Sequence, residues 1–159
     1  METSSLEPLL REHRFLRELS DDHVRFMAGC ARNVRFAAGE LLFREGDAAD
    51  ALLLLRSGSL VLEIDVPGRG VVRLESAGEG EMLGWSWLFP PYRHELDARA
   101  LEPVRALAFD AGCLRRKMEE NHDFGYALAM QLLDQAHRRL GGLRLLRLDL
   151  YRTDAGSWA

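Results

Sequence analysis

The chain has 159 residues, 47% of them hydrophobic and 29% charged, a balance that suits one folded domain with a buried core and excludes a disordered protein. Its net charge of −4 argues against a general nucleic-acid binder, which is normally basic. The longest apolar run, 51–55, is far shorter than a membrane span, and no secretion signal follows the first residue. We therefore expect a cytoplasmic protein that does not enter a membrane.

The N-terminal segment, 6–32, predicts helices. Ser20 is a suitable N-cap, and Asp21 and Asp22 follow it, where the positive end of a helix favours acids. Apolar residues then recur at helical spacing: Val24, Met27, Ala28 and Ala31. The leucine-rich stretch 6–19 before this helix predicts one or two further short helices.

The middle segment, 33–110, predicts a β-roll. Its short β-prone pieces are separated by Gly, Pro or Asp about every ten residues, which is typical of a sandwich or barrel. The stretch 67–70 predicts a hairpin turn between two of them. The pieces are 34–36, 41–43, 52–56, 60–65, 71–75, 98–101 and 104–109. We expect an antiparallel jelly-roll barrel.

The last segment, 111–150, returns to helical spacing. Asp110 is placed to cap a short helix through Met118, and Asn121 to cap a longer one. Gly141 and Gly142 interrupt the longer helix and predict a bend or a break there. The apolar stripe of this helix is Leu132, Ala136, Leu140, Leu143, Leu146 and Leu150. Its basic outer face is Arg138, Arg139, Arg144, Arg147 and Arg152.

The cysteines and histidines do not indicate a metal site or a catalytic site. Cys30 and Cys113 lie far apart without the spacing of metal ligands, which favours buried thiols over a disulfide or a zinc site. The five histidines are scattered along the chain, and no nucleophile elbow or Walker loop is present. We expect no metal, no cofactor and no enzymatic activity. A metal-dependent cupin-type enzyme, suggested by His94, Glu95 and Asp97, is the weakest of three hypotheses.

Two glycine-containing segments resemble a known family. They are residues 39–50, GELLFREGDAAD, and residues 55–60, LRSGSL. Together with the helices and the roll, they resemble the cyclic-nucleotide-binding domain family, which includes the sensor domain of regulators of the catabolite activator protein type. The resemblance runs from about residue 13 to about residue 149. It implies a double-stranded β-helix (jelly-roll) with N-terminal helices and a long C-terminal helix.

The resemblance also implies a phosphate-binding cassette within 78–91, GEGEMLGWSWLFPP. In the family this cassette is a turn and a short helix whose free N–H groups hold the phosphate. An arginine adds the countercharge, and a glutamate accepts from the ribose. Here Gly84 matches the cassette glycine, Trp85 stands where the glutamate belongs and His94 where the arginine belongs, with Glu95 beside it. A carboxylate about 4 Å from a phosphate repels it by several kcal/mol at an effective dielectric near 20.

The predicted ligand-binding residues are Gly84, Trp85, Ser86, Trp87, Arg93, His94 and Arg99. Arg93 and Arg99 either replace the missing cation or are structural or surface charges, and the second interpretation is favoured because strand neighbours face opposite sides. The aromatic cluster of Trp85, Trp87, Phe89 and Tyr92 either lines an apolar pocket, fills it or covers a partner surface. If this stretch is helical, Trp85 and Trp87 are not expected to face the same cavity.

Two further hypotheses about function follow from the resemblance. In the first, the chain is a non-enzymatic regulatory sensor domain that binds a cyclic nucleotide (cAMP or cGMP) or another compact anion. It then signals to an unidentified protein partner through the C-terminal helix. In the second, the pocket is degenerate and the chain is a protein-interaction module. In the regulators the C-terminal helix forms a homodimer, so the apolar stripe is either a dimer seam or packs on its own barrel. Without their helix-turn-helix domain, we expect no DNA binding by this chain alone.

Overall fold

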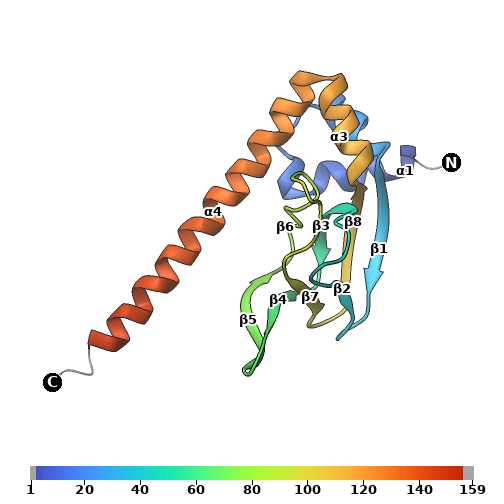
Figure 1. The fold of residues 1–159 in the computed structure, drawn as a ribbon. Helices are drawn as coiled ribbons and strands as arrows, with labels where there is room; N and C mark the ends of the chain where they lie inside the picture. Colours follow the sequence, from blue (N-terminus) through green and yellow to red (C-terminus); the bar gives the residue numbers. More distant parts are fainter. Residues whose placement is uncertain (1–2, 156–159) are drawn as a thin grey trace.

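The computed structural model describes the backbone of residues 3–155 and the side chains of residues 6–148 (Figure 1). The helices are α1 (Thr3–Glu12), η1 (Arg14–Leu16, a 3-10 helix), α2 (Asp21–Ala28), α3 (Ala111–Glu120) and α4 (His122–Ala155). The strands are β1 (Ala31–Phe36), β2 (Leu41–Phe43), β3 (Ala51–Ser57), β4 (Leu60–Val66), β5 (Gly70–Ala77), β6 (Met82–Leu83), β7 (Asp97–Ala100) and β8 (Val104–Asp110).

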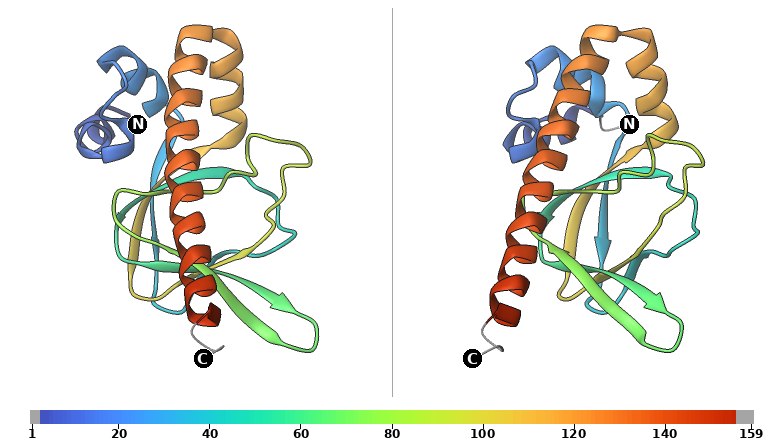
Figure 2. Two further views of the ribbon diagram at one scale, coloured as in Figure 1. Left: turned by 90° about the vertical axis from the view of Figure 1, so that its left-hand side faces the viewer. Right: turned by 60° about the vertical axis from the view of Figure 1, so that its left-hand side comes forward.

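The strands form two facing antiparallel sheets, the jelly-roll arrangement that the sequence predicted (Figure 2). One sheet has the order β1-β8-β3-β6 and the other β2-β7-β4-β5. Long-range pairs set the register, for example Val34 with Ala106 and Leu62 with Ala98. The short strand β6 was not predicted, because two residues carry no visible alternation.

Helix caps form where the sequence placed them. The Ser20 side chain accepts from the His23 N–H at the start of α2, and Asp110 accepts from the Cys113 N–H at the start of α3. Asn121 Oδ1 accepts from the Phe124 N–H at 3.1 Å where α4 begins. These bonds satisfy N–H groups that the first turn of a helix leaves unpaired, and they confirm all three predicted caps.

The buried apolar residues form two clusters. One lies under the helices and includes Phe15, Met27, Trp87 and Phe124. The other lies between the sheets and includes Leu55, Leu60 and several alanines, which let the sheets approach closely. The helical cluster reaches Leu132 on α4, so the first half of that helix belongs to the domain core.

The prediction of two free thiols was wrong. Cys30, directly before β1, forms a disulfide with Cys113 in α3, with 5.8 Å between their Cα atoms. The two residues are 83 apart in the chain, and only the packing of α3 against the α2–β1 junction brings them together. Disulfides persist mainly in oxidising compartments, so the expected cytoplasmic location stays a prediction.

Of the predicted bend or break at Gly141 and Gly142, the break was wrong, because α4 continues through both as one α-helix. No heavy atom outside the local helix lies within 4 Å of where a Cβ would stand at either glycine. A glycine lowers helix stability by about 1 kcal/mol but does not break the hydrogen-bond ladder. In the part of the chain that the structure describes, neither α4 nor any other helix is both long and apolar enough to cross a membrane.

Candidate functional site

The segment between β5 and β7 carries most of the predicted ligand-binding residues. After β6 the chain turns at Gly84, whose φ of 92° lies in the left-handed region that favours glycine. A Cβ there would lie 3.3 Å from the Ala51 carbonyl oxygen and 3.9 Å from His94 Cε1. Residues 85–92, all of which are described, form turns and irregular loop rather than the short helix implied by the resemblance. No helix N-terminus therefore faces a ligand within this loop.

A cavity of about 130 Å³ lies beside this turn, and we call it the roll cavity. It is lined by Phe43, Leu62, Glu75, Leu83, Gly84, Trp85, Ser86, His94, Glu95, Leu96 and Arg139. The structure thus brings Gly84, Trp85, Ser86 and His94 to one cavity and leaves Trp87, Arg93 and Arg99 outside its lining. Glu95, the acid that the sequence places next to His94, also lines this cavity.

His94 is a buried, neutral group rather than a permanent cation. Its side chain stacks on Phe43 with the ring centroids 3.6 Å apart and the planes 3° apart. Burial lowers the pKa of His94 below its ordinary value of 6.5, and the charges of Asp47 and Asp50 offset only part of that effect. The imidazole is therefore largely uncharged at pH 7 and offers hydrogen bonding without a countercharge.

Arg93 and Arg99 form structural contacts. Arg93 Nη1 donates to the Gly46 carbonyl at 2.8 Å from an exposed position. Arg99 Nε donates to the buried Glu63 carboxylate at 2.7 Å, and its Nη1 donates to the Gly39 carbonyl at 2.9 Å. Their guanidinium groups hold loops and neighbouring strands together, which is the interpretation that the sequence favoured.

The aromatic cluster divides between several environments. Trp87 is fully buried in the helical core, and its Nε1 has no hydrogen-bond partner. Trp85 is half-buried and lines the roll cavity. Phe89 is exposed, and Tyr92 packs its ring against Arg115, whose guanidinium carbon lies 4.2 Å from the ring centroid. Trp85 and Trp87 do not share a cavity, although the stretch is an irregular loop and not the helix on which that expectation rested.

Arg139 is the site residue that the sequence did not identify. Its Nη2 donates to the Met82 carbonyl of β6 at 2.8 Å, and its Nη1 lies 3.7 Å from Glu75 Oε1 of β5. That Nη1 atom is buried and has no hydrogen-bond partner. Arg139 lies on the apolar stripe expected from the sequence, seven residues after Leu132, which is buried, and seven before Leu146, which lines the helix side of the site. That spacing was the available signal, whereas the sequence assigned Arg139 to the exposed basic face.

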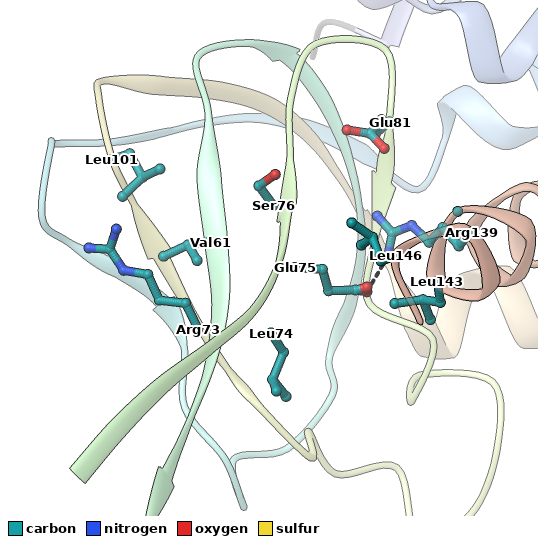
Figure 3. A pocket seen from close by; sticks show the side chains of 11 residues that line it. Val61, Arg73, Leu74, Glu75, Ser76, Glu81, Leu101, Arg139, Leu143 and Leu146 are labelled. Atoms are coloured by element: carbon teal, nitrogen blue, oxygen red, sulfur yellow. Dashed lines mark ion pairs between the residues drawn. The ribbon is translucent and has the colours of Figure 1, made fainter. Parts of the chain in front are cut away.

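A larger groove lies on the other side of Arg139. It has a volume of about 510 Å³ and runs between β5 and α4, and we call it the helix groove (Figure 3). Leu143 and Leu146 of α4 point into it opposite Leu74 and Val61 of the sheet. Glu75 and Arg139 line both the helix groove and the roll cavity, so their ion pair lies between the two spaces.

The side chains around the site do not form a metal centre. Within residues 6–148, no three His, Cys, Asp or Glu side chains are grouped so that they would hold a metal ion. The polar groups of the roll cavity are one guanidinium, one imidazole, one hydroxyl and two carboxylates. This set suits the recognition of a small polar molecule by hydrogen bonds and one positive charge.

Comparisons with known proteins agree with this fold. The sequence profile of the cyclic nucleotide-binding domain family matches residues 33–121, more than half of the chain. A candidate cyclic nucleotide-binding protein from Geobacter metallireducens GS-15 is 27% identical, with a TM-score of 0.74 over 88% of this chain and 98% of that protein. A comparison with curated proteins found no match.

Two further solved structures share the fold. The sensor domain of the transcriptional regulator DNR from Pseudomonas aeruginosa is 22% identical, with a TM-score of 0.68 over 89% of this chain and 95% of that domain. The regulatory domain of Toxoplasma gondii PKA, solved with cAMP, is 18% identical, with a TM-score of 0.69 over 86% of this chain and 50% of that one.

Proposed function

The chain belongs to the cyclic nucleotide-binding domain family, and we propose that it is a non-enzymatic sensor domain that binds a small ligand in the roll cavity and signals through α4. The ligand is a cyclic nucleotide or another compact anion. The observation that carries this proposal is the position of Arg139, which α4 contributes to the wall between the roll cavity and the helix groove.

Arg139 supplies the positive charge that the cassette lacks. A buried N–H without an acceptor costs about 1–3 kcal/mol, and the Nη1 atom of Arg139 is in that condition. A ligand oxygen at this point would satisfy it, while Nη2 keeps its bond to the Met82 carbonyl. A guanidinium can pair with two oxygens of one phosphate or carboxylate, which adds specificity to the contact.

The carboxylates of the cavity limit the charge of the ligand. Glu75 lies 3.7 Å from Arg139 Nη1, so an incoming anion competes with it for the same cation. Glu95 adds a second negative charge to the lining. With one arginine against two carboxylates, a ligand with a single negative charge is favoured over a polyanion. A cyclic nucleotide carries one such charge on its phosphodiester.

The remaining cavity residues provide shape and hydrogen bonding. Gly84 lets the backbone approach the ligand, because the cavity wall has no Cβ at that point. The Ser86 hydroxyl and the neutral His94 imidazole offer hydrogen bonds, and Trp85 offers an apolar surface. This assignment keeps four of the residues chosen from the sequence and replaces Arg93 and Arg99 with Arg139.

In this proposal α4 transmits the signal, because it carries Arg139. A ligand that draws Arg139 away from Glu75 changes a contact that fixes α4 against β5. Exposed apolar residues on α4 then present the change to a second copy of the chain or to another protein. They include Tyr126, Met130, Leu133 and Leu140, whose spacing of three, four and seven suits a helix pair. Leu132, part of the seam expected from the sequence, is buried in the domain itself, and the Leu150 side chain lies outside the described residues.

Calorimetric titration with cAMP and with cGMP tests this proposal. Arg139→Gln should weaken binding by about tenfold or more, because a buried charged hydrogen bond contributes about 1.5–3 kcal/mol. The matched control is Arg138→Gln, since Arg138 is exposed and pairs with Asp134 on the same helix. Equal affinities for the wild type and Arg139→Gln would contradict the role of Arg139.

The second candidate function is that of an interaction module with a degenerate pocket. The observation that favours it is the small roll cavity, about 130 Å³, against roughly 300–1,000 Å³ for most ligand sites. If millimolar cAMP and cGMP produce no heat and no change in tryptophan fluorescence, this function is preferred. Leu133→Lys should then disrupt association of the chain, because Leu133 is 61% exposed on α4.

A further inference from the structure

A third space, a cleft, lies between η1, the end of β3 and the turn that follows β5. Its volume is about 480 Å³, within the range of small-molecule sites. We call it the arginine cleft, and its lining is Leu9, Glu12, His13, Arg14, Arg17, Leu55, Arg56, Glu79 and Gly80. It shares no lining residue with the roll cavity or the helix groove.

Hydrogen bonds fix the floor of the arginine cleft. The Leu55 carbonyl accepts from His13 Nε2 at 2.8 Å and from the Gly80 N–H at 2.9 Å. His13 Nδ1 accepts from the Phe15 N–H at 3.2 Å. Both ring nitrogens of His13 are therefore used, and the imidazole is neutral. One carbonyl thus ties η1, β3 and the 78–81 turn together, so the three walls of the cleft are held in place.

Three arginines stand over this floor, and their charges are not neutralised by ion pairs. Ion pairs within residues 6–148 involve Arg11, Arg25, Arg99, Arg138 and Arg139, and none of these pairs includes Arg14, Arg17 or Arg56. Arg56 Nη1 donates to Asn33 Oδ1 at 3.3 Å. The stem of Arg14 packs on the turn, because a Cβ at Gly80 would lie 3.7 Å from Arg14 Cβ and 3.8 Å from its Cδ.

The three guanidinium groups all lie close enough to His13 to affect its pKa. Burial is the main reason that the pKa of His13 is lowered, and Arg14, Arg56 and Arg17 each lower it further. Glu12 and Glu79 also line the cleft, so three positive and two negative side chains leave one net positive charge there. The two carboxylates moderate the field without cancelling it.

We propose that the arginine cleft binds the phosphoryl group of a small molecule, at a site separate from the roll cavity. Planar guanidinium groups pair with phosphate oxygens in forked geometry, and three of them on a fixed floor suit an anion of more than one charge. Such a ligand would join η1 to the 78–81 turn, which leads directly into β6 and Gly84. The proposal does not depend on any ligand in the roll cavity.

Titration with inorganic pyrophosphate at constant ionic strength tests the proposal, with sulfate as the comparison anion. Heat is measured by calorimetry, and backbone amide shifts in NMR spectra locate the site. We expect saturable binding with shifts at Phe15 and Gly80, and weaker binding of sulfate, which has fewer oxygens to engage three arginines. Arg14→Gln and Arg17→Gln should each lower affinity by about tenfold, and Glu79→Gln should raise it.

The control variant is Arg69→Gln, in the β4–β5 turn, which removes the same charge outside the cleft. Arg14, Arg17 and Arg69 are all exposed, so the three variants should fold alike. An equal loss of affinity in Arg69→Gln would assign the effect to net charge and overturn the proposal. Absence of saturable binding, or shifts confined to residues outside the cleft, would overturn it as well.

Discussion

The two halves of α4 differ in how much of their surface is buried. Up to Arg139 the helix buries Phe124, Leu128 and Leu132 in the domain core, whereas every residue from Leu140 to Leu148 is exposed. The ribbon of α4 runs on past the sheets toward the C-terminus (Figure 1). The core therefore fixes the direction of the first half, and the second half follows that direction through its own hydrogen bonds. Arg139 lies at the boundary between the two halves.

The largest expected effect is a difference in stability between the halves. Phe124→Ala should lower the free energy of unfolding by about 3–5 kcal/mol, because Phe124 is fully buried and packs edge-on against Phe26 at 5.2 Å. Leu145→Ala should change it by less than about 0.5 kcal/mol, since Leu145 is 66% exposed. Urea unfolding of both variants gives the comparison, and similar losses would show that the second half is also packed.

Loss of the disulfide should give the next largest decrease in stability. One of its two cysteines lies in α3, which packs against the first half of α4. Replacing Cys30 and Cys113 with serine should cost about 2–4 kcal/mol, since the bond closes a loop between residues 83 apart. Adding reductant to the wild type should lower the unfolding midpoint in the same direction. A midpoint that reductant leaves unchanged would mean that the thiols are not paired in solution.

Two glycine substitutions should have opposite effects on stability, one at the roll cavity and one in the second half of α4. Gly84→Ala should destabilise the fold by about 1–2 kcal/mol, because alanine at φ 92° is strained and its Cβ crowds the Ala51 carbonyl. Gly142→Ala should stabilise it by about 0.5–1 kcal/mol, since no atom would contact the new methyl group. Thermal unfolding checks both signs, and a loss of stability in Gly142→Ala would show an unseen contact on the second half.

The smallest effect concerns pH. The pKa of His94 is lowered by folding, so the unfolded chain binds more protons as pH falls below 6.5, and stability should decrease in that range. His94→Gln should show a shallower decrease, and the remaining slope includes His13, whose pKa is also lowered. His137→Gln, an exposed change on α4, is the control. Identical slopes in all three proteins would remove His94 from this account.

Local signals predicted the local structure. The caps at Ser20, Asp110 and Asn121 and the β-roll follow from patterns within a few residues, and the structure confirms them. The disulfide between Cys30 and Cys113 joins distant segments, and no spacing rule announces such a pair. The continuous helix at Gly141 and Gly142 shows that a propensity penalty of about 1 kcal/mol per residue does not end a long helix.

The site was only partly predictable for the same reason. Gly84, Trp85, Ser86 and His94 are close in sequence and line one cavity. Arg139 comes from another element, and its role depends on how α4 crosses β5 and β6. Arg93 and Arg99 are near the cavity in sequence, but hydrogen bonds to Gly46, Glu63 and Gly39 occupy them elsewhere.

Hydrogen–deuterium exchange of the full chain, with and without millimolar cAMP, tests most directly whether the site is coupled to α4. The account predicts slower exchange at 84–86, where the ligand binds, together with altered exchange over 140–155, the projecting half of α4. In Arg139→Gln both changes should be lost. Slower exchange at 84–86 with no change over 140–155 would contradict the coupling, and no change in either segment would contradict binding of this nucleotide.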